Sequence, residues 1–223
     1  MGEMVEFPSN GSTAEGYLAA PDGRGPGLVV VQEWWGLVPH IKDVADRFAA
    51  EGFVALAPDL FHGETTFEPD QAGKLLMDMD LERAGRDLGG SVDYLLGQEQ
   101  VEPKKIGSVG FCAGGALALM LATLKPVDAA VTFYGGPIKS KPNYANLRGP
   151  VLGHFGTEDH GASPEYANAL FDEIRSHGVE ATLYFYEGAG HAFFNDDRPS
   201  VHHPEHADLA WRRTLDFFRA NLR

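Results

Sequence analysis

The residue with the clearest chemical potential is the single cysteine, Cys112, which stands in the segment Gly110-Phe111-Cys112-Ala113-Gly114-Gly115. An apolar run at 106–109 precedes it and an alanine-rich run at 116–122 follows it, which predicts a turn between a strand and a helix. Flanking glycines allow a tight turn that lifts a nucleophile above a sheet, and a helix N-terminus favours a thiolate. We therefore predict a nucleophilic Cys112 with the backbone N–H of Ala113 as an oxyanion donor. The alternative is a buried structural cysteine.

A thiol nucleophile needs a base, and the candidate is His191 in the glycine-rich segment 188–193. A histidine base in turn needs a carboxylate that fixes its tautomer. Asp159 follows the apolar run 151–155, and we favour it over its neighbour Glu158. Taken alone, His191 reads equally well as a surface-loop histidine and Asp159 as a turn residue. Together with Cys112 they give the chain order cysteine, acid, histidine, which is the order found in α/β-hydrolases.

A fourth candidate is Glu33, which follows the apolar run 28–32 and precedes Trp34 and Trp35. A carboxyl group beside two tryptophans is expected to be poorly solvated, which raises its pKa and allows it to exchange a proton. The alternative is a solvated loop glutamate. The loop after this strand is also where hydrolases supply a second oxyanion donor, here the backbone N–H of Trp34.

The elements that must position these residues alternate between strands and helices along the chain. An N-terminal hairpin is predicted around Asn10-Gly11. The apolar runs predict strands at 28–32, 53–57, 106–109, 129–134, 151–155 and 181–186. Helical spacing of apolar residues predicts helices at 41–48, 81–95, 116–122, 163–176 and 211–222. This alternation predicts one α/β domain over residues 1–223, with a mainly parallel sheet covered by helices on both faces. Ligands of such sheets bind beyond the carboxyl ends of the strands.

The net charge and the cysteine content restrict the partners and the cellular location that we expect. The net charge is -14, which disfavours nucleic acid and membrane surfaces as partners and leaves a small molecule. One cysteine permits no internal disulfide, and the first residues have neither a basic start nor an apolar run, so we expect no signal peptide and a cytoplasmic location. We expect a monomer or a weak homo-oligomer.

Several segments together resemble the dienelactone hydrolase family, the carboxymethylenebutenolidases. The resemblance runs over almost the whole chain, and the cysteine turn combined with the glutamate after the first buried strand is its most specific part. The segments that carry it are Gln32–Gly36, Ala57–Leu60, Gly110–Gly115, Tyr134–Gly135, Gly156–His160 and Ala189–Phe193.

The resemblance implies an α/β-hydrolase fold and hydrolysis of an ester or lactone through an acyl-enzyme, without a cofactor. It implies that Glu33 holds or takes the thiol proton when substrate arrives. The remaining implied roles are the triad Cys112, Asp159 and His191, the oxyanion donors Trp34 and Ala113, and the pocket-lining residues Trp35, Tyr134 and Phe193.

One departure from the family pattern concerns substrate recognition. Relatives that act on dienelactone carry an arginine four residues after the catalytic histidine, where this chain has Asn195, and the stretch 65–80 contains no arginine. Loss of a bidentate arginine–carboxylate contact favours an uncharged or differently shaped ester as substrate, unless Arg83, Arg86 or Arg198 replaces the missing arginine. A general carboxylesterase, a thioesterase and a non-catalytic binding protein remain alternatives.

A metal site is a weaker interpretation. His202, His203 and His206 lie close together, but Pro204 stands between them, and only one pair has the spacing of helical ligands. We interpret this segment as a polar entry to a helix and expect no metal.

Overall fold

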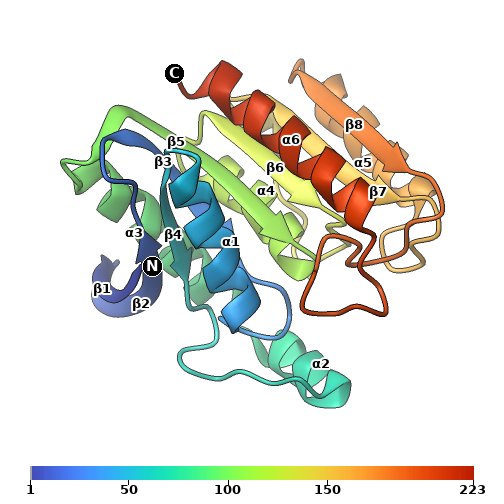
Figure 1. Ribbon diagram of the computed structural model, residues 1–223, viewed down its shortest axis with the longest axis horizontal. Coiled ribbons are helices and arrows are strands. Elements are labelled where there is room, and N and C mark those ends of the chain that lie inside the picture. Colours follow the sequence, from blue (N-terminus) through green and yellow to red (C-terminus); the bar gives the residue numbers. More distant parts are fainter. Residues whose placement is uncertain (1) are drawn as a thin grey trace.

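The apolar runs form the strands of an eight-stranded sheet in the computed structural model, which describes residues 2–223 (Figure 1). The strand order is β1-β2-β4-β3-β5-β6-β7-β8. The pairs β1–β2 and β2–β4 are antiparallel, and the other pairs are parallel. The strands are β1 (Glu3–Ser9), β2 (Ser12–Ala19), β3 (Gly25–Val31), β4 (Val54–Pro58), β5 (Val101–Phe111), β6 (Ala129–Phe133), β7 (Val151–Gly156) and β8 (Ala181–Tyr186).

Both faces of the central strands of this sheet are buried, as the continuous apolar runs predict. In β3, Leu28 and Val30 point into one core cluster, whereas Val29 and Val31 point into the other. All four side chains are fully buried. The two-residue period of a strand thus supplies two cores from one short segment.

Helices cover the two faces separately. In Figure 1, α1 and α6 lie on the near face, and the apolar residues of α3, α4 and α5 belong to the cluster on the far face. The helices are α1 (Pro39–Ala50), α2 (Pro69–Asp78), α3 (Leu81–Gly97), α4 (Ala113–Leu124), α5 (Pro164–Ser176) and α6 (Pro204–Asn221), with a short 3₁₀ turn η1 (Tyr144–Asn146). Among residues 2–223, no helix combines the length and apolar character needed to span a bilayer.

The parallel strands bring the predicted chemistry to one edge of the sheet. Glu33 follows β3, Cys112 follows β5, Asp159 follows β7 and His191 follows β8. Because parallel strands point the same way, these four positions lie at the same edge. The α/β-hydrolase fold is thereby confirmed, with a mixed and mostly parallel sheet.

Two elements were not predicted from the sequence. The helix α2 projects from the body at the bottom of Figure 1 and buries only Ala72, although Ala72, Leu75, Leu76 and Met79 have helical spacing in the sequence. The turn η1 is too short to show any period. The strand β5 also begins earlier than expected, at Val101, which pairs with Gly25 of β3 before a shift in register.

The core under α6 generates a stability prediction. Phe218 is fully buried and contacts the rings of Phe48 and Phe53. We expect Phe218→Ala to lower the free energy of unfolding by ~3–5 kcal/mol, because it leaves a cavity. Urea denaturation measures this change, with Phe67→Ala as control. Phe67 is 74% exposed, and its removal should cost less than ~0.5 kcal/mol. Equal effects of the two substitutions would contradict this description of the core.

Candidate active site

Cys112 lies in a strained turn between β5 and α4. Its φ is 55° and its ψ is -124°, a backbone conformation that residues other than glycine rarely adopt. The turn requires Gly110, because a Cβ atom there would lie 1.9 Å from the carbonyl oxygen of Gly114. Cys112 is itself half-buried, and it directly precedes the first residue of α4. The turn therefore presents the sulfur at the positive end of a helix.

His191 and Asp159 form a close pair beside this turn. His191 Nδ1 lies 2.7 Å from Asp159 Oδ2, and the Asp159 side chain is fully buried. The other oxygen, Oδ1, accepts the backbone N–H groups of Gly161 and Ala162 at 2.7 and 2.8 Å. Glu158, the rival acid, is exposed, and the structure places Asp159 rather than Glu158 against the histidine.

The electrostatic states of this pair follow from burial and hydrogen bonding. Burial alone would raise the pKa of Asp159, but the hydrogen bond and charge of His191 outweigh it, and the pKa is lowered. Burial likewise opposes a charged imidazole, yet hydrogen bonds with Asp159 and Cys112 raise the pKa of His191 to about 10. Asp159 is thus a carboxylate and His191 an imidazolium at neutral pH.

Glu33 lies on the other side of the site and is almost fully buried, at 2% exposed. Its Oε2 accepts Asn195 Nδ2 at 2.7 Å, and its Oε1 accepts the Tyr134 hydroxyl at 3.4 Å. Burial raises its pKa, although nearby His40, Asn195 and His191 oppose the shift. Burial and the charges of Glu33 and Cys112 raise the pKa of Tyr134, so its hydroxyl remains a donor.

The sequence did not indicate that Asn195, which stands four residues after His191, is a partner of Glu33. The loop that carries Asn195 is anchored to α1 through the next residue, Asp196. Asp196 Oδ1 lies 3.2 Å from Nδ1 of the buried His40, and Asp196 Oδ2 lies 2.5 Å from the guanidinium of Arg47. These contacts of Asp196, which we call the clamp, hold the backbone that presents the Asn195 amide to Glu33.

Among the described residues, the side chains best arranged to hold a metal ion overlap with this clamp. His40, Asp196 and Asp197 each offer one donor atom, and these atoms lie within 4.8 Å of one another. The Arg47 guanidinium already supplies a positive charge to Asp196. The histidines near the start of α6 make contacts of another kind. The rings of His203 and His206 stack with centroids 3.9 Å apart, and His206 Nε2 lies 3.0 Å from the Glu187 carbonyl oxygen.

A cavity of about 490 Å³ opens above the sulfur and is mainly apolar. Cys112, Ala113, His191 and Trp34 contribute to it from the sheet edge, and Arg198 and Lys139 bring two cations. Lys139 donates to the carbonyl oxygen of Met77. The remaining lining residues are Leu76, Met77, Met79, Leu81, Gly136, Pro137, Ile138 and Gly161.

The expectation that Trp35, Tyr134 and Phe193 line the pocket is not met. All three are buried, at 6%, 0% and 0% exposed, and none is among the residues that line the cavity. They pack behind its wall instead. Tyr134 contacts the rings of His191 and Phe193, and Trp35 lies beneath the Arg198 guanidinium, 5.2 Å from it. Their aromatic surface orients the residues that do face the cavity.

The two predicted oxyanion donors both belong to residues of this cavity. Ala113 is the first residue of α4, so its backbone N–H has no partner within the helix. Trp34 lies in the loop after β3, across the cavity edge from the α4 N-terminus.

Comparisons with known proteins identify the family of this chain. The model of the dienelactone hydrolase family matches residues 14–222. The chain is 39% identical to Protein usf of Aquifex pyrophilus over the full length of both chains. It is 36% identical, also over both full lengths, to a protein of Aquifex aeolicus that carries a provisional carboxymethylenebutenolidase name.

A solved structure of a dienelactone hydrolase-like promiscuous phosphotriesterase from metagenomic libraries superposes with a TM-score of 0.90 at 26% identity, covering 100% of this chain and 99% of that one. An esterase of Thermogutta terrifontis shares the fold, with a TM-score of 0.71 at 19% identity over 96% and 94% of the two chains. With a family model that matches nearly its whole length, this chain belongs to the dienelactone hydrolase family.

Proposed function

We propose that this chain hydrolyses carboxylic esters or lactones through an acyl-enzyme formed on Cys112. The observation that carries the proposal is the position of Cys112. It stands in a positive-φ turn at a helix N-terminus and lines the same cavity as His191, whose Nδ1 lies 2.7 Å from the buried carboxylate of Asp159. This is the nucleophile, base and orienting acid that covalent acyl transfer needs.

In the first half-reaction, the Cys112 thiolate attacks the carbonyl carbon and the carbonyl oxygen takes the negative charge. The backbone N–H groups of Ala113 and Trp34 stabilise that oxyanion. The C–O bond then breaks, and the His191 imidazolium gives its proton to the departing alkoxide. With a lactone the alcohol stays attached to the acyl group.

In the second half-reaction, neutral His191 takes a proton from water, the water oxygen attacks the thioester carbonyl, and the carboxylic acid leaves as the thiolate returns. Glu33, whose pKa burial raises, exchanges the thiol proton when Cys112 is not yet ionised. Tyr134 and Asn195 hold its carboxyl group in place.

The cavity favours a mainly apolar substrate. Its walls carry two leucines, two methionines and an isoleucine, which suit an alkyl or aromatic group. Arg198 is the cation best placed to hold an anionic substituent, because its planar group stacks on Trp35 while it lines the cavity. Arg198 would then do the work of the arginine that relatives acting on dienelactone carry where this chain has Asn195. A panel of lactones, aryl esters, acyl thioesters and a phosphotriester separates these substrate classes.

The nucleophile is tested directly by Cys112→Ala. We expect kcat/KM for a lactone or aryl ester to fall by at least about a thousandfold, because no other group can form the acyl-enzyme. The variant should keep the melting temperature and still bind substrate, which separates lost chemistry from lost folding. Undiminished turnover would remove Cys112 from the mechanism. Ligand binding without turnover in the native chain would instead identify a binding protein.

The charge state of His191 makes a pH prediction. Because the pKa of His191 is raised to about 10, the imidazolium persists at neutral pH, and acylation should weaken only as the pH rises through that value. In Asp159→Asn the hydrogen bond to a carboxylate is lost, so the alkaline limb should move to lower pH. Single-turnover acylation measured from about pH 6 to about pH 11 follows this limb.

The matched control for this shift is Glu158→Gln, which removes the neighbouring exposed carboxylate and should leave the alkaline limb in place. An alkaline limb that stays put in Asp159→Asn, or moves equally in both variants, would contradict the assigned pair.

A further inference from the structure

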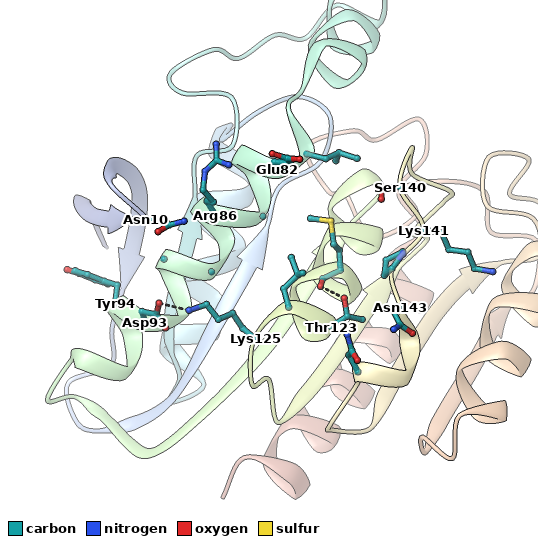
Figure 2. Close-up of a pocket in the computed structure, with 18 of the residues that line it drawn as sticks. Asn10, Glu82, Arg86, Asp93, Tyr94, Thr123, Lys125, Ser140, Lys141 and Asn143 are labelled. Carbon is teal, nitrogen blue, oxygen red and sulfur yellow. Dashed lines mark hydrogen bonds and ion pairs between the residues drawn. The ribbon is translucent and has the colours of Figure 1, made fainter.

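A second cavity, of about 1030 Å³, adjoins the catalytic one and lies between α3, α4 and the segment 140–146 (Figure 2). We call it the α3–α4 groove. In Figure 2, Glu82, Arg86 and Asp93 come from α3 on one side, and Ser140, Lys141 and Asn143 come from the 140–146 segment on the other. None of the reactions described above uses these residues.

The groove and the catalytic cavity share a wall. Leu81, the first residue of α3, lines both of them. Along one loop, Ile138 and Lys139 line the catalytic cavity, and the next two residues, Ser140 and Lys141, line the groove. A ligand that leaves the catalytic cavity over Leu81 therefore enters the groove directly.

In the groove, the side chains of Lys125 and Leu124 pack closely against glycines of α3. A Cβ atom at Gly89 would lie 2.9 Å from Lys125 Cε, and one at Gly85 would lie 3.3 Å from Leu124 Cδ1. Leu124 is nonetheless 58% exposed, and together with Met120 it gives the groove an apolar strip open to solvent. An exposed leucine in such a depression is a surface that an extended ligand can cover.

The groove also carries positive charge in a chain whose net charge is -14. Three basic residues line it against two acidic ones. Lys125 pairs with Asp93 at 2.5 Å, and Lys141 pairs with Glu173 at 2.8 Å. Within residues 2–223, Arg86 has no carboxylate partner at salt-bridge distance. Its guanidinium is therefore available to an anionic group of a ligand.

We infer that the α3–α4 groove binds the leaving-group portion of extended esters or thioesters that end in a carboxylate or phosphate. This inference rests on the proposed function. The acyl group stays in the catalytic cavity on Cys112, the chain of the leaving group crosses Leu81 and the strip formed by Met120 and Leu124, and its terminal anion binds Arg86. Cleavage breaks the acyl C–O or C–S bond, and the alcohol or thiol leaves along the groove with the proton from His191.

The test compares four butyryl thioesters. One thiol is short and uncharged, and the other three are long and end in a hydroxyl group, a carboxylate or a phosphate. We expect the native chain to prefer the anionic long substrates. In Arg86→Gln the ratio of kcat/KM between anionic and short substrates should fall about tenfold, the value of one charge-assisted hydrogen bond. The arm with the larger change identifies the anion.

Arg83→Gln is the matched control, because Arg83 lies on α3 three residues away, is exposed and does not line the groove. Its ratio should stay unchanged. An equal ratio in the native chain and Arg86→Gln, or an equal loss in both variants, would overturn the inference while leaving the proposed hydrolysis intact.

A binding measurement separates the inference from the proposed chemistry. Calorimetry of the uncleaved anionic thioester on Cys112→Ala should show a Kd that rises about tenfold when Arg86→Gln is added, and no rise with Arg83→Gln. An unchanged Kd would overturn the groove assignment, whatever the native chain does to the ester bond.

Discussion

The placement of the Cys112 turn and the Asp159–His191 pair at one edge of the sheet is the constraint on which the rest of the site depends. The turn keeps Cys112 at a φ of 55° because the glycine at 110 lets the chain pass close to α4. Asp159 in turn keeps the imidazole in one orientation through a 2.7 Å hydrogen bond. The strained Cys112 turn and the oriented histidine keep their mutual geometry because they follow β5 and β8, two parallel strands of one rigid sheet.

The site also holds two carboxyl groups in environments that shift their pKa values in opposite directions. Asp159 receives a cationic histidine and two backbone N–H groups, which hold its pKa below the ordinary value. Glu33 lies among buried groups and receives one amide and one hydroxyl, and burial raises its pKa. Carboxyl groups whose pKa values are shifted in opposite directions suit different roles, and in the proposed mechanism Asp159 stays an anion while Glu33 carries a proton. Asn195 is central to this arrangement, because an amide stabilises Glu33 without the full charge of an arginine.

Much of this site follows from local patterns. Cys112, Asp159, His191 and Glu33 each stand just after an apolar run, and parallel strands place such positions together. The sequence could not reveal which side of a loop faces the cavity. Trp34 lines the cavity, whereas its neighbour Trp35 is buried behind it. The contact between Asn195 and Glu33 joins residues 162 positions apart and leaves no local pattern. The helix α2, in contrast, carries a local signal that the prediction missed, because Ala72, Leu75, Leu76 and Met79 follow a helical period.

The most direct test of the central claim is to capture the covalent intermediate. A lactone or aryl ester is mixed with the native chain, quenched in acid within the first turnover, and the peptides are analysed by mass spectrometry. The account predicts a mass increase equal to the acyl group on the peptide that contains Cys112, appearing before product accumulates and absent from Cys112→Ala. Full turnover without any adduct on that peptide, or an adduct on another side chain that forms and decays at the turnover rate, would contradict it.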